Sequence, residues 1–167
     1  SYTLTIPNFI FLEAPIGYGK TFFIKELCEN TLKEAKVINY PIKSKTILKS
    51  FLAELFQKEF SNIYDYYKVL EVSQEKIVFI FDDFHLLQQD EELMEFITFF
   101  LKNNFENLYF ILASREKINL PYENTISSNR DLYINQTKLK INLDTLENPL
   151  TEEDKLFLAK FALGYYL

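Results

Sequence analysis

Short apolar runs alternate with helical patterns along most of this chain. Several runs have consecutive apolar side chains, which is typical of strands buried on both faces of a parallel sheet; they cover residues 9–12, 37–42, 76–81 and 108–113. Between them, apolar residues recurring at helical spacing predict helices over residues 20–34, 46–60, 63–72 and 91–102. Strands that alternate with helices in this way predict an α/β fold, with a mostly parallel five-stranded sheet covered by helices on both faces.

The two ends of the chain have weaker patterns. Residues 2–6 alternate apolar and polar side chains, which predicts an edge strand or arm. Residues 116–130 are polar and rich in turn-forming types, which predicts a surface loop. Two segments, 132–134 and 139–143, are candidates for the fifth strand, and the second has the better alternation. Residues 150–166 are predicted to form a final helix.

Composition indicates one folded domain. The 167 residues are 48% hydrophobic, which suffices for one core, so we expect a single domain over residues 1–167. The net charge of −6, without a long Lys/Arg run, argues against strong nucleic-acid binding by this segment. The single Cys28 is expected to be a small core residue. No membrane-spanning apolar stretch or signal peptide is visible, which favours a cytoplasmic protein, and the apolar end suggests a segment of a larger one.

The segment after the first predicted strand has the residue types of a phosphate-binding loop. It reads Ala14-Pro15-Ile16-Gly17-Tyr18-Gly19-Lys20-Thr21 and precedes a predicted helix. In such a P-loop, backbone N–H groups cradle the phosphates, the lysine neutralises the β- and γ-phosphates, and the threonine hydroxyl binds Mg²⁺. Ala14 stands where the consensus has its first glycine. The alternative to a phosphate-binding loop is an ordinary strand-to-helix turn that happens to contain Gly-Lys-Thr. The motif predicts an ATP and Mg²⁺ site in a three-layer P-loop NTPase fold. The helix that follows is predicted to bury Phe22, Phe23, Ile24, Leu27 and Leu32.

Polar residues follow the next two clearest strands. Asp82 and Asp83 come directly after residues 77–81. In a P-loop protein the first carboxylate holds Mg²⁺, and the second orients or deprotonates the attacking water. Ser114 and Arg115 end the following strand. Because a parallel sheet binds ligands at the carboxyl ends of its strands, this pair is predicted to lie beside the γ-phosphate and to sense its state. Alternatively, the two aspartates simply begin the following loop, and Arg115 is a solvated side chain in a surface loop. His85 is expected to be a hydrogen-bonded structural residue. The predicted catalytic residues are Asp83, Lys20 and Arg115, with Thr21 and Asp82 as metal ligands.

These three motifs, in this order, resemble a known family. Residues 14–21 (APIGYGKT), 77–87 (IVFIFDDFHLL) and 111–121 (ILASREKINLP) resemble the ATPase domain of large LuxR-type, maltose-regulon activator-like transcription activators. That family belongs to the STAND class of P-loop ATPases. Its Asp-Asp-Tyr-His motif is matched by residues 82–85, with Phe84 in place of tyrosine. Ile16 replaces a small residue of the family's P-loop.

The resemblance implies a regulatory ATPase core. Such a core binds ATP with Mg²⁺, hydrolyses it slowly and switches a larger protein between states, through self-association or contacts with its other domains. ATP and ADP would be its ligands, and no direct contact with nucleic acid or membrane is expected. Two alternatives remain open at this point. One is an AAA+-like mechanical ATPase, such as a DNA replication or loading factor, and the other is an inert nucleotide-binding scaffold.

Overall fold

Five parallel strands form one sheet in the computed structural model, which describes residues 7–42, 46–103, 105–120 and 131–136. The strands lie in the order β2-β3-β4-β1-β5, and each neighbouring pair is parallel. They are β1 (Phe9–Glu13), β2 (Lys36–Asn39), β3 (Ile77–Phe81), β4 (Leu108–Ser114) and β5 (Asp131–Asn135). The predicted parallel five-stranded sheet is confirmed.

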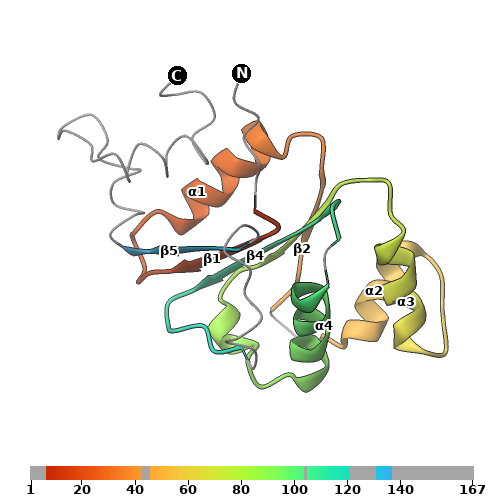
Figure 1. The fold of residues 1–167 in the computed structure, drawn as a ribbon. Coiled ribbons are helices and arrows are strands. Elements are labelled where there is room, and N and C mark those ends of the chain that lie inside the picture. The colour runs from red at the N-terminus through yellow and green to blue at the C-terminus, as the bar shows by residue number, and fades with distance from the viewer. Residues whose placement is uncertain (1–6, 43–45, 104, 121–130, 137–167) are drawn as a thin grey trace.

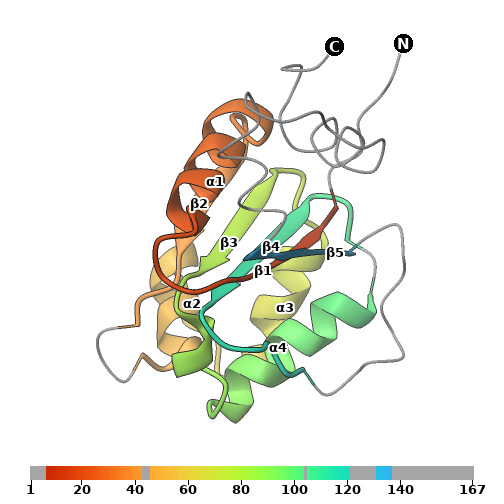
Figure 2. The same cartoon turned by 90° about the vertical axis from the view of Figure 1, so that its left-hand side faces the viewer.

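Helices cover both faces of this sheet (Figure 1). Helix α1 (Lys20–Glu26), continued by the π-helical turn η1 (Leu27–Thr31), lies on one face. Helices α2 (Leu48–Phe56), α3 (Ile63–Glu71) and α4 (Glu91–Lys102) pack on the other. Figure 2 shows the same division from the side. A short 3-10 turn, η2 (Phe84–Leu86), follows β3. The result is the three-layer arrangement predicted from the sequence.

Each strand divides its side chains between two cores, because successive residues of a strand point to opposite faces. Phe9 and Phe11 of β1 join the core under α2, α3 and α4, whereas Ile10 and Leu12 pack toward α1. Phe110 of β4 lies in the first core and stacks on Phe9, with ring centroids 4.7 Å apart and planes 3° apart. Burial on both faces explains why consecutive apolar residues identified these strands.

Two elements, the helix after the glycine loop and strand β2, differ in extent from the prediction. The helix predicted over residues 20–34 ends at Thr31, because Leu32 leaves the helical conformation while its N–H still bonds the Leu27 carbonyl. Phe22, predicted to be buried, is 50% exposed, because Phe23 and Ile24 already form the inward side of α1. Strand β2 ends at Asn39, short of the predicted residue 42, and its last bond to β3 runs from the Tyr40 N–H to the Ile80 carbonyl at 2.9 Å, directly before Pro41.

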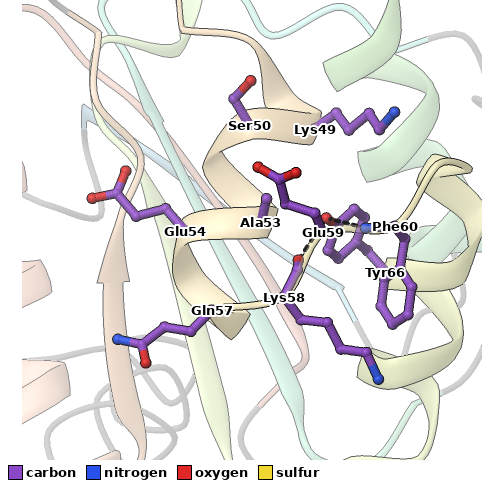
Figure 3. A pocket seen from close by; sticks show the side chains of 9 residues that line it. All are labelled: Lys49, Ser50, Ala53, Glu54, Gln57, Lys58, Glu59, Phe60 and Tyr66. Atoms are coloured by element: carbon purple, nitrogen blue, oxygen red, sulfur yellow. Dashed lines mark hydrogen bonds between the residues drawn. The ribbon is translucent and has the colours of Figure 1, made fainter.

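The helix predicted over residues 46–60 is α2, which stops at Gln57 in the left-handed conformation, with φ 50° and ψ 43°. The Tyr66 hydroxyl of α3 accepts a hydrogen bond from the Phe60 N–H at 2.9 Å and donates one to the Lys58 carbonyl at 2.7 Å (Figure 3). The ring of Phe60 also packs edge-on against Tyr66, with centroids 4.8 Å apart. The apolar Phe60 is therefore accommodated by a loop that returns to α3, and the helix need not continue.

We expect Gln57→Gly to raise the free energy of unfolding by about 1 kcal/mol, because glycine adopts the left-handed conformation without the steric cost that a side chain incurs. Chemical denaturation of the wild-type and variant chains measures the difference. Gln57→Ala is the matched control, since it removes the same side chain but keeps the Cβ, and it should give no gain. Equal stability of the glycine and alanine variants would contradict this account.

The remaining predicted elements lie at the end of the chain or in loops. Residues 132–134 form part of β5, which pairs in parallel with β1. The segment 139–143, which has the better alternation, lies outside the described residues, as do the predicted arm at 2–6 and the predicted helix at 150–166. Residues 116–120 of the predicted loop have no regular structure, and 121–130 lie outside the described ranges.

Candidate nucleotide-binding site

The loop between β1 and α1 has the backbone that a P-loop needs. Gly17 and Gly19 have φ angles of 88° and 84°, in the left-handed region that favours glycine. A Cβ built on Gly17 would meet no atom within 4 Å, so the space beside it is open to a ligand. Gly19 is the N-cap of α1, and the first intrahelical bond joins the Phe23 N–H to its carbonyl at 2.9 Å. The preceding N–H groups of α1 have no partner within the helix, which suits an anion.

Ala14 shows why the loop tolerates the loss of the first consensus glycine. Its side chain is 2% exposed and packs in the core beneath α1. Its N–H donates to the Ser114 carbonyl at 3.0 Å, which ties the start of the loop to the end of β4. Among the described residues other than glycine, only Gln57 and Asp83 have positive φ, so Ala14 does not need the conformational freedom of glycine.

Lys20 lies among the charged residues predicted for the site. Its ammonium group donates hydrogen bonds to the carbonyl of Ala14 and, at 3.0 Å, to that of Pro15. Burial lowers the pKa of Lys20, and the positive charge of Arg115 adds to this effect, while Asp82 and Asp83 act in the opposite direction. The charges of Asp82, Asp83 and Arg115 therefore act on Lys20, although these residues follow β3 and β4 and are distant from Lys20 in sequence.

The two aspartates have different surroundings at the end of β3. Asp82 is exposed, and its Oδ1 accepts a hydrogen bond from the Asp83 N–H at 2.9 Å. Asp83 has left-handed φ and ψ angles of 50° and 44°, which aspartate tolerates better than most residues. Its Oδ1 lies 3.5 Å from the Arg115 Nε, with side-chain exposures of 36% and 45%. An ion pair this exposed contributes at most about 1 kcal/mol to stability. A ligand that binds Asp83 or Arg115 more strongly can therefore break the pair.

The residues present fit Mg²⁺ bound together with a nucleotide. Within the described ranges, no group of three or more His, Cys, Asp or Glu side chains could hold a metal by itself. Mg²⁺ is usually held by one or two protein ligands together with phosphate oxygens and water, which requires no such group. Asp82 is an exposed residue of the turn after β3, and Thr21 is an exposed residue in the first turn of helix α1.

Three polar side chains hold the segment after β4, residues 115–119, and two of them, Glu13 and Gln88, were not singled out in the sequence. The Oε1 of Glu13, the last residue of β1, accepts from the Ile118 N–H at 2.9 Å. The Oε1 of Gln88 accepts from the Asn119 N–H at 2.9 Å, and the Nδ1 of His85 accepts from the Arg115 N–H at 3.4 Å. His85 is thus a hydrogen-bonded residue, as expected. Glu13 lies beside the P-loop motif, but acceptance of a backbone bond from a remote loop has no sequence signature.

Ser114 and Cys28 make no direct contribution to the site. Ser114 is fully buried, and its hydroxyl is engaged in a turn, since it donates to the Glu116 carbonyl at 2.6 Å and accepts from the Glu116 N–H at 3.0 Å. Cys28 is partly buried against the α1 core, and burial raises the pKa of its thiol. A raised pKa disfavours the nucleophilic thiolate, in agreement with the structural role expected for Cys28.

A separate hollow of about 560 Å³ lies on the opposite helical layer, between α2 and the segment that returns to α3 (Figure 3). Its lining combines Lys49 and Lys58 with Glu54 and Glu59, so it carries no dominant charge. It shares no residue with the predicted nucleotide site. Over the described residues, no helix has the length and apolar character needed to cross a membrane.

Comparisons with known proteins show the fold of the chain. No protein-family model matches it, and no curated protein matches its sequence. It is similar to a chain in the structure of Drosophila ORC bound to AT-rich DNA and Cdc6, with a TM-score of 0.55 and 9% identity, covering 77% of this chain and 48% of that one. For Drosophila ORC bound to GC-rich DNA and Cdc6, the TM-score is 0.52 and the identity 11%, with coverage of 77% and 49%.

The chain thus spans about half the length of these two neighbours. At such identities the likeness shows a shared fold alone. Together with the parallel sheet in the order β2-β3-β4-β1-β5 and helices on both faces, it shows a three-layer P-loop NTPase fold.

Proposed function

We propose that residues 1–167 form one ATP-binding domain that hydrolyses ATP slowly and acts as a regulatory switch in a larger protein. The observation that carries the proposal is the gathering of Lys20, Asp82, Asp83 and Arg115 at the carboxyl edge of the parallel sheet. Lys20 is close enough to the other three for their charges to act on its pKa, and Arg115 pairs with Asp83. We assign phosphate binding, metal binding and water activation to these side chains, which lie around one glycine loop.

The loop residues Ala14, Pro15, Ile16, Gly17, Tyr18 and Gly19 would cradle the phosphates, and Lys20 would exchange the carbonyls of Ala14 and Pro15 for phosphate oxygens. Thr21 and Asp82 would hold Mg²⁺, which when bound neutralises part of the phosphate charge. Asp83 would accept a proton from the attacking water.

The Asp83–Arg115 pair supplies the basis for a switch. With ATP bound, the γ-phosphate would attract Arg115 away from Asp83, which would free the carboxylate to act on water. With ADP bound, the pair would form again. The low energy of an ion pair exposed to this degree makes the exchange easy. Loss of γ-phosphate contacts on hydrolysis is a common way to release a conformational change. The resemblance to STAND-class transcription activators supports this regulatory role.

A second candidate is an AAA+-like mechanical ATPase, favoured by the fold likeness to chains of Drosophila ORC bound to DNA and Cdc6. Such an enzyme assembles into a ring. The net charge of −6 speaks against DNA contacts by this segment itself.

Phosphate release and light scattering, measured together with Mg²⁺ and ATP, distinguish the candidates. For the switch we expect measurable release slower than about 1 s⁻¹, the low end of ordinary enzyme rates, without a nucleotide-dependent ring. Faster release together with ring formation would replace the switch by the mechanical ATPase. Tight ATP binding without any release would instead indicate an inert scaffold.

A further inference from the structure

Residues 115–119 are held by side chains from both neighbouring loops. Glu13 comes from the root of the P-loop, while His85 and Gln88 come from the turn that follows Asp82 and Asp83. Each side chain accepts a hydrogen bond from a backbone N–H of the segment. Within the segment, only Arg115 carries a side chain predicted to contact the nucleotide. The position of the Arg115 side chain therefore depends on hydrogen bonds to the backbone of residues 115–119, which the three side chains named above accept.

Glu13 makes the most buried of the three bonds, since the bond from the Asn119 N–H to Gln88, also 2.9 Å long, is exposed. Its bond to the Ile118 N–H is 2.9 Å long and partly buried, whereas the bond from His85 to the Arg115 N–H is 3.4 Å long and exposed. Ile118 itself is 3% exposed in the core under α4, so its N–H has a fixed location. In the sheet register Glu13 lies opposite Ser114, directly before Arg115. The same stretch of β1 thus leads into the P-loop through Ala14 and anchors the arginine segment through Glu13.

We propose that Glu13 is a positioning residue for ATP recognition, which fixes Arg115 relative to the P-loop through its hydrogen bond to Ile118. This inference rests on the proposed function. In this role the carboxylate serves as the hydrogen-bond acceptor of the Ile118 N–H. An amide oxygen in the same place can accept the same bond. Glu13→Gln should therefore preserve the role and Glu13→Ala should remove it.

Calorimetric titration with ATP and with ADP, each with Mg²⁺, tests the role of Glu13. In Glu13→Ala we expect the dissociation constant for ATP to rise about 5- to 10-fold, the scale of one lost hydrogen bond, while that for ADP changes less than about 2-fold on the same scale. Glu13→Gln should match the wild-type chain for both nucleotides. Glu13→Ala combined with Arg115→Ala should bind ATP no more weakly than Arg115→Ala alone, because both changes remove one coupled interaction.

Equal weakening of ATP and ADP binding by Glu13→Ala, failure of Glu13→Gln to restore it, or additive effects with Arg115→Ala would each overturn the inference while leaving the proposed function intact. A wild-type chain that binds neither nucleotide would overturn both. If Glu13→Ala does not fold, Gln88→Ala provides the same test at the other anchor of the segment, with Gln88→Glu as the control that keeps the acceptor oxygen.

Discussion

Replacing Lys20 with methionine is expected to weaken ATP binding by about 100-fold or more, the scale of charge-assisted hydrogen bonds to phosphate. Methionine keeps the length of the side chain and removes the ammonium group, which in the proposed site exchanges two loop carbonyls for phosphate oxygens. Calorimetric titration with Mg²⁺ and ATP measures the change. Lys25→Met is the matched control, since Lys25 is an exposed lysine of the same helix, and it should leave the dissociation constant within about 2-fold of wild type.

The same variant should not lose stability at neutral pH. Burial lowers the pKa of Lys20, so the folded chain disfavours the charged lysine; this cost is complete below the lowered pKa and is lost as the pH rises from there to the ordinary lysine pKa. Removing the ammonium group at neutral pH therefore relieves a cost, and we expect an unchanged or higher melting temperature. ATP affinity equal to that of wild type in Lys20→Met would remove this loop from the nucleotide site.

Replacing Asp83 with asparagine is expected to slow phosphate release by about 100-fold or more, the usual contribution of a general base. Asparagine tolerates the left-handed backbone of this position, so the loop should keep its shape. It cannot take a proton from water, and it no longer forms an ion pair with Arg115. ATP binding should therefore persist at wild-type strength or better, because Arg115 becomes available to the γ-phosphate.

Single-turnover phosphate release, measured beside ATP affinity, separates these two effects of Asp83→Asn. Asp65→Asn is a suitable control, because it removes a surface carboxylate paired only weakly with Lys68, at 3.9 Å. An unchanged release rate in Asp83→Asn would show that this carboxylate is not the base and would leave its pair with Arg115 as a structural contact.

The parallel sheet could be predicted from the sequence because its central strands have an unambiguous apolar pattern. Strands β3 and β4 are continuous apolar runs buried on both faces, and few other structures accommodate such runs. The ends of the helices were less predictable. Phe60 has helical spacing relative to α2, yet its ring and its N–H are satisfied by Tyr66 of α3. A tertiary contact of this kind replaces the last helical turn, and local spacing contains no information about it.

The candidate site also contains residues that the sequence indicates and residues that it does not. The assignment of Lys20, Asp82 and Asp83 to the site is a prediction from motifs, because phosphate and metal chemistry restricts the residue types and their spacing. The assignment of Arg115 is a prediction from topology, since the carboxyl ends of parallel strands lie at one edge of the sheet. Glu13 and Gln88 could not be found in this way. Each accepts a bond from a backbone N–H, which any residue except proline supplies, so no residue type in the partner segment points back to them.

The most direct test of the account is a calorimetric titration of the wild-type chain with ATP, in the presence and absence of Mg²⁺. The account predicts saturable binding of one ATP, weaker without Mg²⁺ and strongly weakened in Lys20→Met. Absence of binding to the wild-type chain, or binding indifferent to Lys20→Met, would contradict the assignment of residues 14–21 as a nucleotide-binding loop.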